Sequence, residues 1–152
     1  YEKAIGNFYK FHLDYETWKV KTSKKLNWSI NNPTDGISEI FPTMKTDIVL
    51  DNIKESKRII IDTKFTSIFT KTNFKEKSLK TNYIYQIYAY LMSQQEKDDP
   101  LNKNSAGMLL HPAIGENIDE SANIQGHDIK FSTVDLTQNH NEIKQRLLEL
   151  IS

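Results

Sequence analysis

The pattern of apolar and polar residues centres on one run in which apolar positions follow each other without a break. Residues 58–65 read Arg-Ile-Ile-Ile-Asp-Thr-Lys-Phe. Consecutive β-branched residues are typical of a central strand that is covered on both faces. Asp62 and Lys64 follow at once and, because side chains alternate along a strand, they share one face roughly 7 Å apart. A buried carboxylate and ammonium need a partner or a metal ion, so this strand end is a candidate site.

Three segments show the spacing of amphipathic helices, with apolar residues three and four positions apart. We expect helices over residues 1–13, 82–94 and 139–151. Asn139 or Asn141 is expected to cap the last of them. In the second helix, the expected buried stripe consists of Ile84, Ile87, Tyr88, Leu91 and Met92.

Alternating and β-branched segments predict the strands, and turn-rich or charged segments predict the loops between them. The expected strands cover residues 15–22, 26–30 (with Trp28 and Ile30 facing inward), 46–50, 58–65, 106–111 and 127–136. The expected loops cover residues 67–81, 98–105 and 113–125. This order favours an α/β fold with mixed α+β character, in which helices flank a central mixed sheet. The helix before residues 106–111 would form a crossover connection, right-handed if the strands it joins are parallel.

Length and composition limit the class of protein. The chain has 152 residues, of which 38% are hydrophobic and 26% charged, as expected for one globular domain. It contains no cysteine, no secretory signal and no run of about 20 apolar residues, so we expect a cytoplasmic protein without a membrane span. Because the chain starts at Tyr1 inside a helical pattern, we expect residues 1–152 to be a C-terminal part of a longer chain.

The strands at residues 46–50 and 58–65 would bring two carboxylates together if they formed an antiparallel hairpin. With Leu50 opposite Ile59, Asp47 stands directly opposite Asp62, and opposed residues lie ~4.5–5.5 Å apart on the same face. Two carboxylates at that distance repel each other, but a divalent cation between them reverses the sign of the interaction. The alternative is that Asp47 merely starts a strand and that Asp62 and Lys64 form an ordinary surface ion pair.

The type of ligand indicates which cation such a site would hold. Asp47, Asp62 and the backbone carbonyl of Thr63 would supply only oxygen atoms, which suits Mg²⁺ or Mn²⁺ rather than zinc. Lys64 would orient or activate a water molecule, or stabilise charge on a phosphate. This chemistry is metal-assisted hydrolysis of a phosphodiester.

The same residues resemble the PD-(D/E)xK nuclease core, in which an Asp precedes an Asp-x-Lys that ends a hydrophobic strand. Gln86 and Tyr90 form Gln-x-x-x-Tyr on one helical face, similar to the motif of the RecB-like branch of that superfamily. The more specific resemblance is to the McrC family, the nuclease subunit of McrBC-type restriction systems. It rests on YEKAIGNFY, FPTMKTDIVL, RIIIDTKF, NYIYQIYAYL and AGMLLHP, in that order, and covers residues 1–112. One departure is that Thr46 precedes Asp47, so the literal Pro-Asp is absent.

The resemblance implies a restriction-endonuclease-like core, a single nuclease domain and a role for each matching residue. Asp47 and Asp62 would bind the metal ion, and Lys64 would be catalytic. Gln86 would contact the site or the DNA backbone, while Tyr90 would support packing and a hydrogen bond. Glu2 would either complete the metal shell, directly or through water, or simply be exposed to solvent.

Lysines between the central strand and the second helix are the expected contacts to DNA phosphates. These are Lys71, Lys75, Lys77 and Lys80, with Glu76 as the one opposing charge and with Lys19, Lys21, Lys24 and Lys25 as further candidates. The alternative is a solvated lysine-rich face, and the formal net charge of zero is unlike that of most DNA-binding domains. Acidic residues expected to lie away from DNA are Asp98, Asp99, Glu116, Asp119 and Glu120.

The absence of a nucleotide-binding motif and the McrC resemblance together indicate which partners to expect. The sequence has no Gly-x-x-x-x-Gly-Lys-Ser/Thr loop for binding nucleotide phosphates. The McrC resemblance implies a McrB-type GTPase motor as partner, double-stranded DNA as substrate and defence against foreign DNA as role, with dimerisation favoured by double-strand cleavage. Two alternatives stay open: another RecB-like exonuclease or repair nuclease, and a catalytically silent nuclease-like docking module.

Overall fold

The computed structural model describes residues 1–71, 73, 75–95 and 97–152. In this part of the chain, six strands form one mixed sheet in the order β1-β2-β3-β6-β8-β7, and β4 pairs with β5 in a small separate sheet. The elements are α1 (Glu2–His12), β1 (Trp18–Leu26), α2 (Ile37–Ile40), β2 (Met44–Asn52), β3 (Lys57–Thr63), β4 (Phe69–Thr70), β5 (Ser78–Leu79), α3 (Thr81–Gln94), the 3-10 helix η1 (Pro100–Asn102), β6 (Ala106–Pro112), β7 (Asp119–Ile124), β8 (His127–Val134) and α4 (His140–Leu150). The predicted class, a central mixed sheet flanked by helices, is confirmed.

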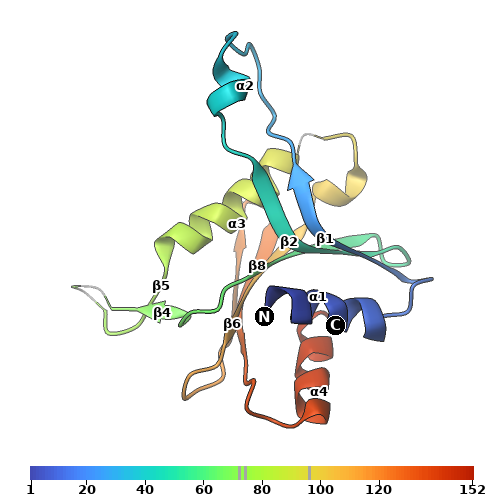
Figure 1. Cartoon of the computed structure of the whole chain (residues 1–152), viewed down its shortest axis with the longest axis vertical. Helices are drawn as coiled ribbons and strands as arrows, with labels where there is room; N and C mark the ends of the chain where they lie inside the picture. The colour runs from blue at the N-terminus through green and yellow to red at the C-terminus, as the bar shows by residue number, and fades with distance from the viewer. Residues whose placement is uncertain (72, 74, 96) are drawn as a thin grey trace.

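Helices cover the sheet on both faces: α1 and α4 lie on one face and α3 on the other (Figure 1). The three isoleucines of β3 divide between the two cores. Ile59 and Ile61 pack with α1 and α4, whereas Ile60 packs with Ile87 and Leu91 of α3. The apolar run therefore forms a central strand covered on both sides, as its sequence predicts.

The step from β3 through α3 to β6 joins neighbouring parallel strands, so the expected crossover unit is present. Helix α3 approaches β6 closely because Gly107 has no side chain. A Cβ added there would lie 2.9 Å from Ile87 Cγ1 and 3.0 Å from Leu91 Cδ1. Gly107 thus sets the height of α3 above the sheet.

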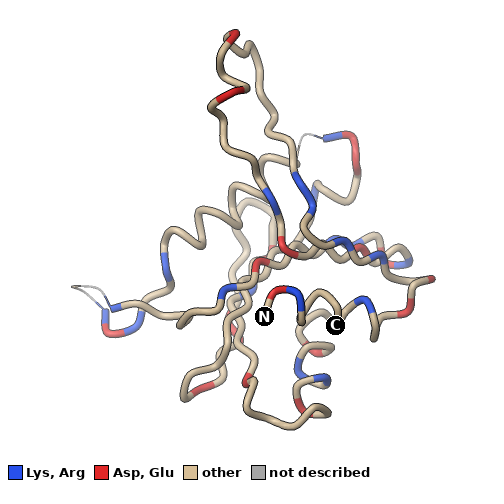
Figure 2. The backbone as a smooth tube through the Cα atoms, in the orientation of Figure 1, with Lys and Arg blue, Asp and Glu red and all other residues tan. Residues whose placement is uncertain are grey.

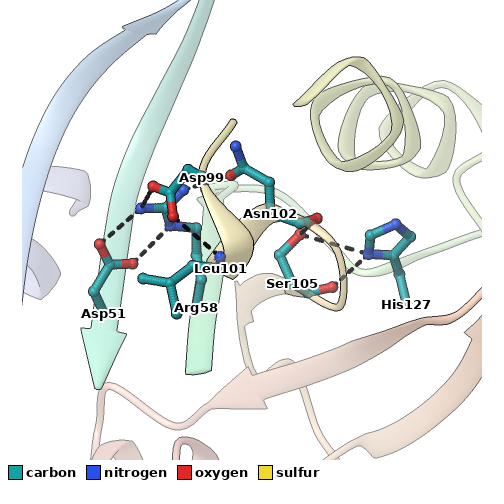
Figure 3. Close-up of polar contacts among 7 residues, drawn as sticks. All are labelled: Asp51, Arg58, Asp99, Leu101, Asn102, Ser105 and His127. Atoms are coloured by element: carbon teal, nitrogen blue, oxygen red, sulfur yellow. Dashed lines mark hydrogen bonds and ion pairs between the residues drawn. The ribbon is translucent and has the colours of Figure 1, made fainter. Parts of the chain in front are cut away.

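A buried network of charged side chains fixes the opposite end of β3 (Figure 3). Arg58 donates to both oxygens of Asp51, at 2.7 and 2.9 Å, and to Asp99 Oδ2 at 3.0 Å. It also donates to Asn102 in η1. The segment predicted as a charged loop over residues 98–105 is therefore tied to the sheet through a 3-10 turn.

The first predicted strands are wrong in position. Residues 15–17 form a turn because the Asp14 carboxylate accepts hydrogen bonds from Glu16 N at 3.1 Å and Thr17 Oγ1 at 3.0 Å. Strand β1 begins only at Trp18 and continues to Leu26, so there is no separate strand at 26–30. Ile30, expected to face inward, is 44% exposed. The segment between β1 and β2, which carries α2, projects from the body of the fold (Figure 1).

Two predicted loops contain strands. Residues 67–81 include β4 and β5, while Thr72 and Phe74 lie outside the described residues. Residues 113–125 include β7, which pairs with β8 at the edge of the sheet and is mostly exposed. Acidic residues on an edge strand remove the apolar alternation that would reveal it.

The predicted helices are confirmed, with a change in the buried stripe of α3. Tyr90 and Gln94 are buried there, whereas Tyr88 and Met92 are only partly buried. Asn139 caps α4 by accepting a hydrogen bond from Glu142 N at 2.9 Å. Among the described residues, no helix has the length and apolar character needed to span a bilayer.

The close contact at Gly107 predicts that Gly107→Ala destabilises the protein by about 1–3 kcal/mol, because the added methyl group overpacks the contact between α3 and β6. Urea denaturation followed by circular dichroism measures this change. Gly36→Ala is the matched control, since a Cβ there meets nothing within 4 Å. Equal stability of the two variants would contradict the close approach of α3.

Candidate active site

The β2–β3 hairpin has the register that the sequence predicts, with Leu50 opposite Ile59. The paired positions end at Ile48 and Ile61, so Asp47 and Asp62 occupy the next position on each strand. Asp47 Oδ2 accepts hydrogen bonds from the Thr63 backbone N at 2.8 Å and from Thr63 Oγ1 at 2.9 Å. At this end of the hairpin, hydrogen bonds to the Asp47 side chain therefore take the place of hydrogen bonds between the two backbones. They hold the Asp47 carboxylate beside Asp62.

Asp62 is a buried carboxylate with unused hydrogen-bonding capacity. Its side chain is 3% exposed, and among the described residues Oδ2 accepts no hydrogen bond, although Lys64 Nζ lies 3.1 Å away. Burial raises the pKa of Asp62 from 3.8 to about 7, the positive charge of Lys64 lowers it, and the nearby charge of Asp47 raises it. The two carboxylates are thus close enough to affect each other electrostatically.

Helix α3 contributes the next contacts to this group. Lys64 Nζ donates to Gln86 Oε1 at 2.8 Å, and Gln86 Nε2 donates to the Tyr90 hydroxyl at 2.7 Å. The Tyr90 hydroxyl donates in turn to the backbone carbonyl of Lys45 on β2, at 3.0 Å. Tyr90 is 5% exposed, and the supporting role expected of it stays a prediction. The Gln-x-x-x-Tyr pair therefore links the end of β3 to β2.

The donor set fits a divalent cation of the Mg²⁺ or Mn²⁺ type. A buried carboxylate oxygen that accepts no hydrogen bond, next to a second carboxylate, is costly without a cation. Mg²⁺ keeps several of its waters and needs only one or two protein carboxylates, which Asp47 and Asp62 can supply. The part expected of the Thr63 carbonyl stays a prediction, whereas the Thr63 amide and hydroxyl have a contact that the sequence did not indicate.

Glu2 lies at the edge of this arrangement. It is exposed and lines, with Asp47, Lys3 and Lys10, a hollow of about 190 Å³ beside α1. In the described ranges, no three His, Asp or Glu side chains are grouped closely enough to hold a metal ion. The structure thus places Glu2 near Asp47 but does not group it with Asp47 and Asp62 as a third metal ligand.

The lysines expected to bind DNA are partly paired with acids. Lys71 lies 3.7 Å from Glu76, and Lys77 forms an ion pair with Glu116. Glu116 therefore lies beside the basic loop, while its expected position away from DNA stays a prediction. Figure 2 shows basic and acidic positions side by side in this region. Lys80 differs, because its Nζ lies 5.6 Å from the ring of Tyr83, next to the site.

One aromatic residue near the site was not predicted. Tyr83, at the start of α3, has Lys64 Nζ 4.8 Å from its ring centroid. The sequence signal was its place three residues before Gln86, which puts both side chains on one side of the helix.

Comparison with known proteins identifies a family and a relative. The family model described as McrBC 5-methylcytosine restriction system component matches residues 1–112. The chain is also 30% identical over 151 residues to the Type IV methyl-directed restriction enzyme EcoKMcrBC of Escherichia coli (strain K12). That alignment covers 99% of this chain and 41% of the relative, so the chain spans about two fifths of the relative's length.

The raised pKa of Asp62 predicts a pH-dependent cost of folding when no metal is present. The folded state holds this proton more tightly than the unfolded chain, so the stabilisation is complete below about pH 4 and is lost as the pH rises through 7. In EDTA, Asp62→Asn should therefore be more stable than the wild type at pH 8, by about 1–3 kcal/mol, with the difference shrinking toward pH 4.

Urea denaturation at several pH values measures this difference. Asp35→Asn, at an exposed position, controls for the loss of one negative charge. A difference between Asp62→Asn and the wild type that is the same at every pH would contradict the assignment.

Proposed function

This chain belongs to the family of McrBC 5-methylcytosine restriction system components, which confirms the resemblance to McrC, and we propose that it is a metal-dependent DNA endonuclease domain. The observation that carries the proposal is the group of Asp47, Asp62 and Lys64 at the end of β3. Asp62 is buried beside a second carboxylate, and the ammonium group lies 3.1 Å from it. A purely structural ion pair would not need the second carboxylate.

The contacts suggest how the residues would divide the work of hydrolysis. Asp47 and Asp62 would hold Mg²⁺ or Mn²⁺, with the Thr63 carbonyl as a further ligand. The bound ion would supply Lewis-acid activation of the phosphate and lower the pKa of a bound water. Thr63 holds Asp47 in place through its amide and hydroxyl. Water would attack the phosphorus atom and give up a proton to solvent, while the bond to the leaving sugar oxygen would break and that oxygen would take up a proton.

Lys64 would act on the phosphate or on the attacking water. Its Nζ is held between Asp62 Oδ2 and Gln86 Oε1, so a single side chain joins the carboxylate site to α3. From this position the ammonium group would stabilise negative charge on a phosphate oxygen, or orient the water by a hydrogen bond. Gln86 would keep Lys64 in place and reach the DNA backbone.

The family suggests a substrate and a partner for this chain. The relative is named a methyl-directed restriction enzyme, and we propose double-stranded DNA as the substrate of this chain as well. A McrB-type GTPase would supply recognition and translocation. Two copies of the domain would be needed to cut both strands in one event. Lys80, whose Nζ lies 5.6 Å from the Tyr83 ring centroid, would bind a phosphate of the DNA near the site.

Asp62→Ala is expected to abolish DNA cleavage by the full-length protein with its GTPase partner, because the buried metal ligand is lost. It should also abolish Mn²⁺ binding in isothermal titration calorimetry, while the circular dichroism spectrum stays that of the wild type. Asp98→Ala, at an exposed position on another loop, is the matched control. Unchanged cutting by Asp62→Ala would refute the proposal, and a wild type that binds no Mn²⁺ would favour a silent docking module.

DNA topology separates an endonuclease from a RecB-like exonuclease. The proposed activity should linearise covalently closed circular DNA that carries the recognised site, because an internal phosphodiester is cut. Agarose gel electrophoresis of circular and linear substrates of the same sequence measures this. Degradation of the linear form alone would assign the protein to the exonuclease alternative.

A further inference from the structure

We propose that Tyr83 is a positioning residue for Lys64, whose ammonium group is held against the face of the Tyr83 ring. The inference rests on the proposed nuclease function. It adds a residue outside the Asp-x-Lys and Gln-x-x-x-Tyr patterns.

Lys64 needs such a contact because a lysine side chain is flexible. Its ammonium group is a compact charge at the end of four rotatable methylene groups. Contacts with two oxygen atoms remove only part of the rotational freedom of this side chain. Nζ lies 3.1 Å from Asp62 Oδ2, 2.8 Å from Gln86 Oε1 and 4.8 Å from the centroid of Tyr83. An aromatic ring attracts a cation within about 6 Å of its centroid through its negative face. The ring therefore provides a third contact that fixes Nζ.

Tyr83 is itself held in place by β6 and by the chain after β3. Its hydroxyl lies 3.4 Å from Thr66 Oγ1, and its ring centroid lies 5.8 Å from that of His111. His111 is buried, and its Nδ1 donates to the Thr66 carbonyl at 2.9 Å. Burial lowers the pKa of His111, which favours the uncharged imidazole beside Lys64. The ring thus rests on a packed support.

Helix geometry explains why Tyr83 joins the residues already assigned. Tyr83, Gln86 and Tyr90 lie three and then four positions apart, which places them along one side of α3. Tyr83 and Gln86 both contact Lys64, and Tyr90 holds Gln86. Tyr85, on the same helix, is 67% exposed and provides a tyrosine of the same size away from the site.

The test separates the ring from the hydroxyl. Tyr83→Phe keeps the ring face and removes the hydroxyl, Tyr83→Leu removes both, and Tyr85→Leu is the matched control. In the full-length protein with its GTPase partner and Mg²⁺, Tyr83→Leu should lower the maximal cleavage rate roughly 10-fold. The DNA concentration for half-maximal rate should not change. Tyr83→Phe and Tyr85→Leu should cut at the wild-type rate.

A second readout does not depend on cleavage. With ¹³C-labelled lysine, the Cε–Hε signal of Lys64, assigned with Lys64→Arg, should lie upfield of the signals of lysines that lie away from aromatic rings, because of the ring current of Tyr83. The upfield shift should persist in Tyr83→Phe and disappear in Tyr83→Leu.

The two readouts distinguish the two proposals. A wild type that cuts no DNA but shows the upfield signal would overturn the nuclease function and leave the contact between Lys64 and Tyr83 intact. An unshifted Lys64 signal in the wild type would overturn the positioning role. So would a loss of activity in Tyr83→Phe as large as in Tyr83→Leu, or an effect of Tyr83→Leu confined to the half-maximal DNA concentration.

Discussion

The burial of one carboxylate, Asp62, is the constraint that the rest of the site satisfies. Its side chain is 3% exposed, and the central strand that carries it is covered on both faces. Each neighbouring side chain either stabilises or destabilises the negative charge of Asp62. Lys64 offsets it, Asp47 opposes it, and α3 holds the offsetting ammonium in place through Gln86. A site that is electrostatically unfavourable when empty is well suited to binding a cation.

The functional side chains lie together because β2, β3 and α3 meet at the end of β3. The hairpin register brings Asp47 next to Asp62, and the crossover through α3 brings Gln86 over Lys64. Gly107 allows α3 to come that close, since any Cβ there would collide with Ile87 and Leu91. The polar contacts of the site thus depend on apolar packing beneath the helix.

Sequence reasoning reached the register and the helices because both depend on short-range periodicity. Two apolar runs that flank a polar turn suggest a hairpin in which Leu50 pairs with Ile59. Because the residue numbers of opposed pairs have a constant sum, that pairing also sets Asp47 opposite Asp62. It missed the turn at Asp14, where a side chain binds nearby donors, and it missed β7, whose edge position allows acidic residues. The spacing from Gln86 places Tyr83 on the side of α3 that carries the motif, but the contact of its ring with Lys64 joins separate elements and is seen only in the fold.

The network around Arg58 has a consequence for the register of the central strand. Sliding β3 by one residue would carry Arg58 to the other face of the sheet, away from Asp51 and Asn102. The network therefore holds β3 in the register that sets Asp62 next to Asp47. The alignment of the two acids is thus secured from the far end of the strand.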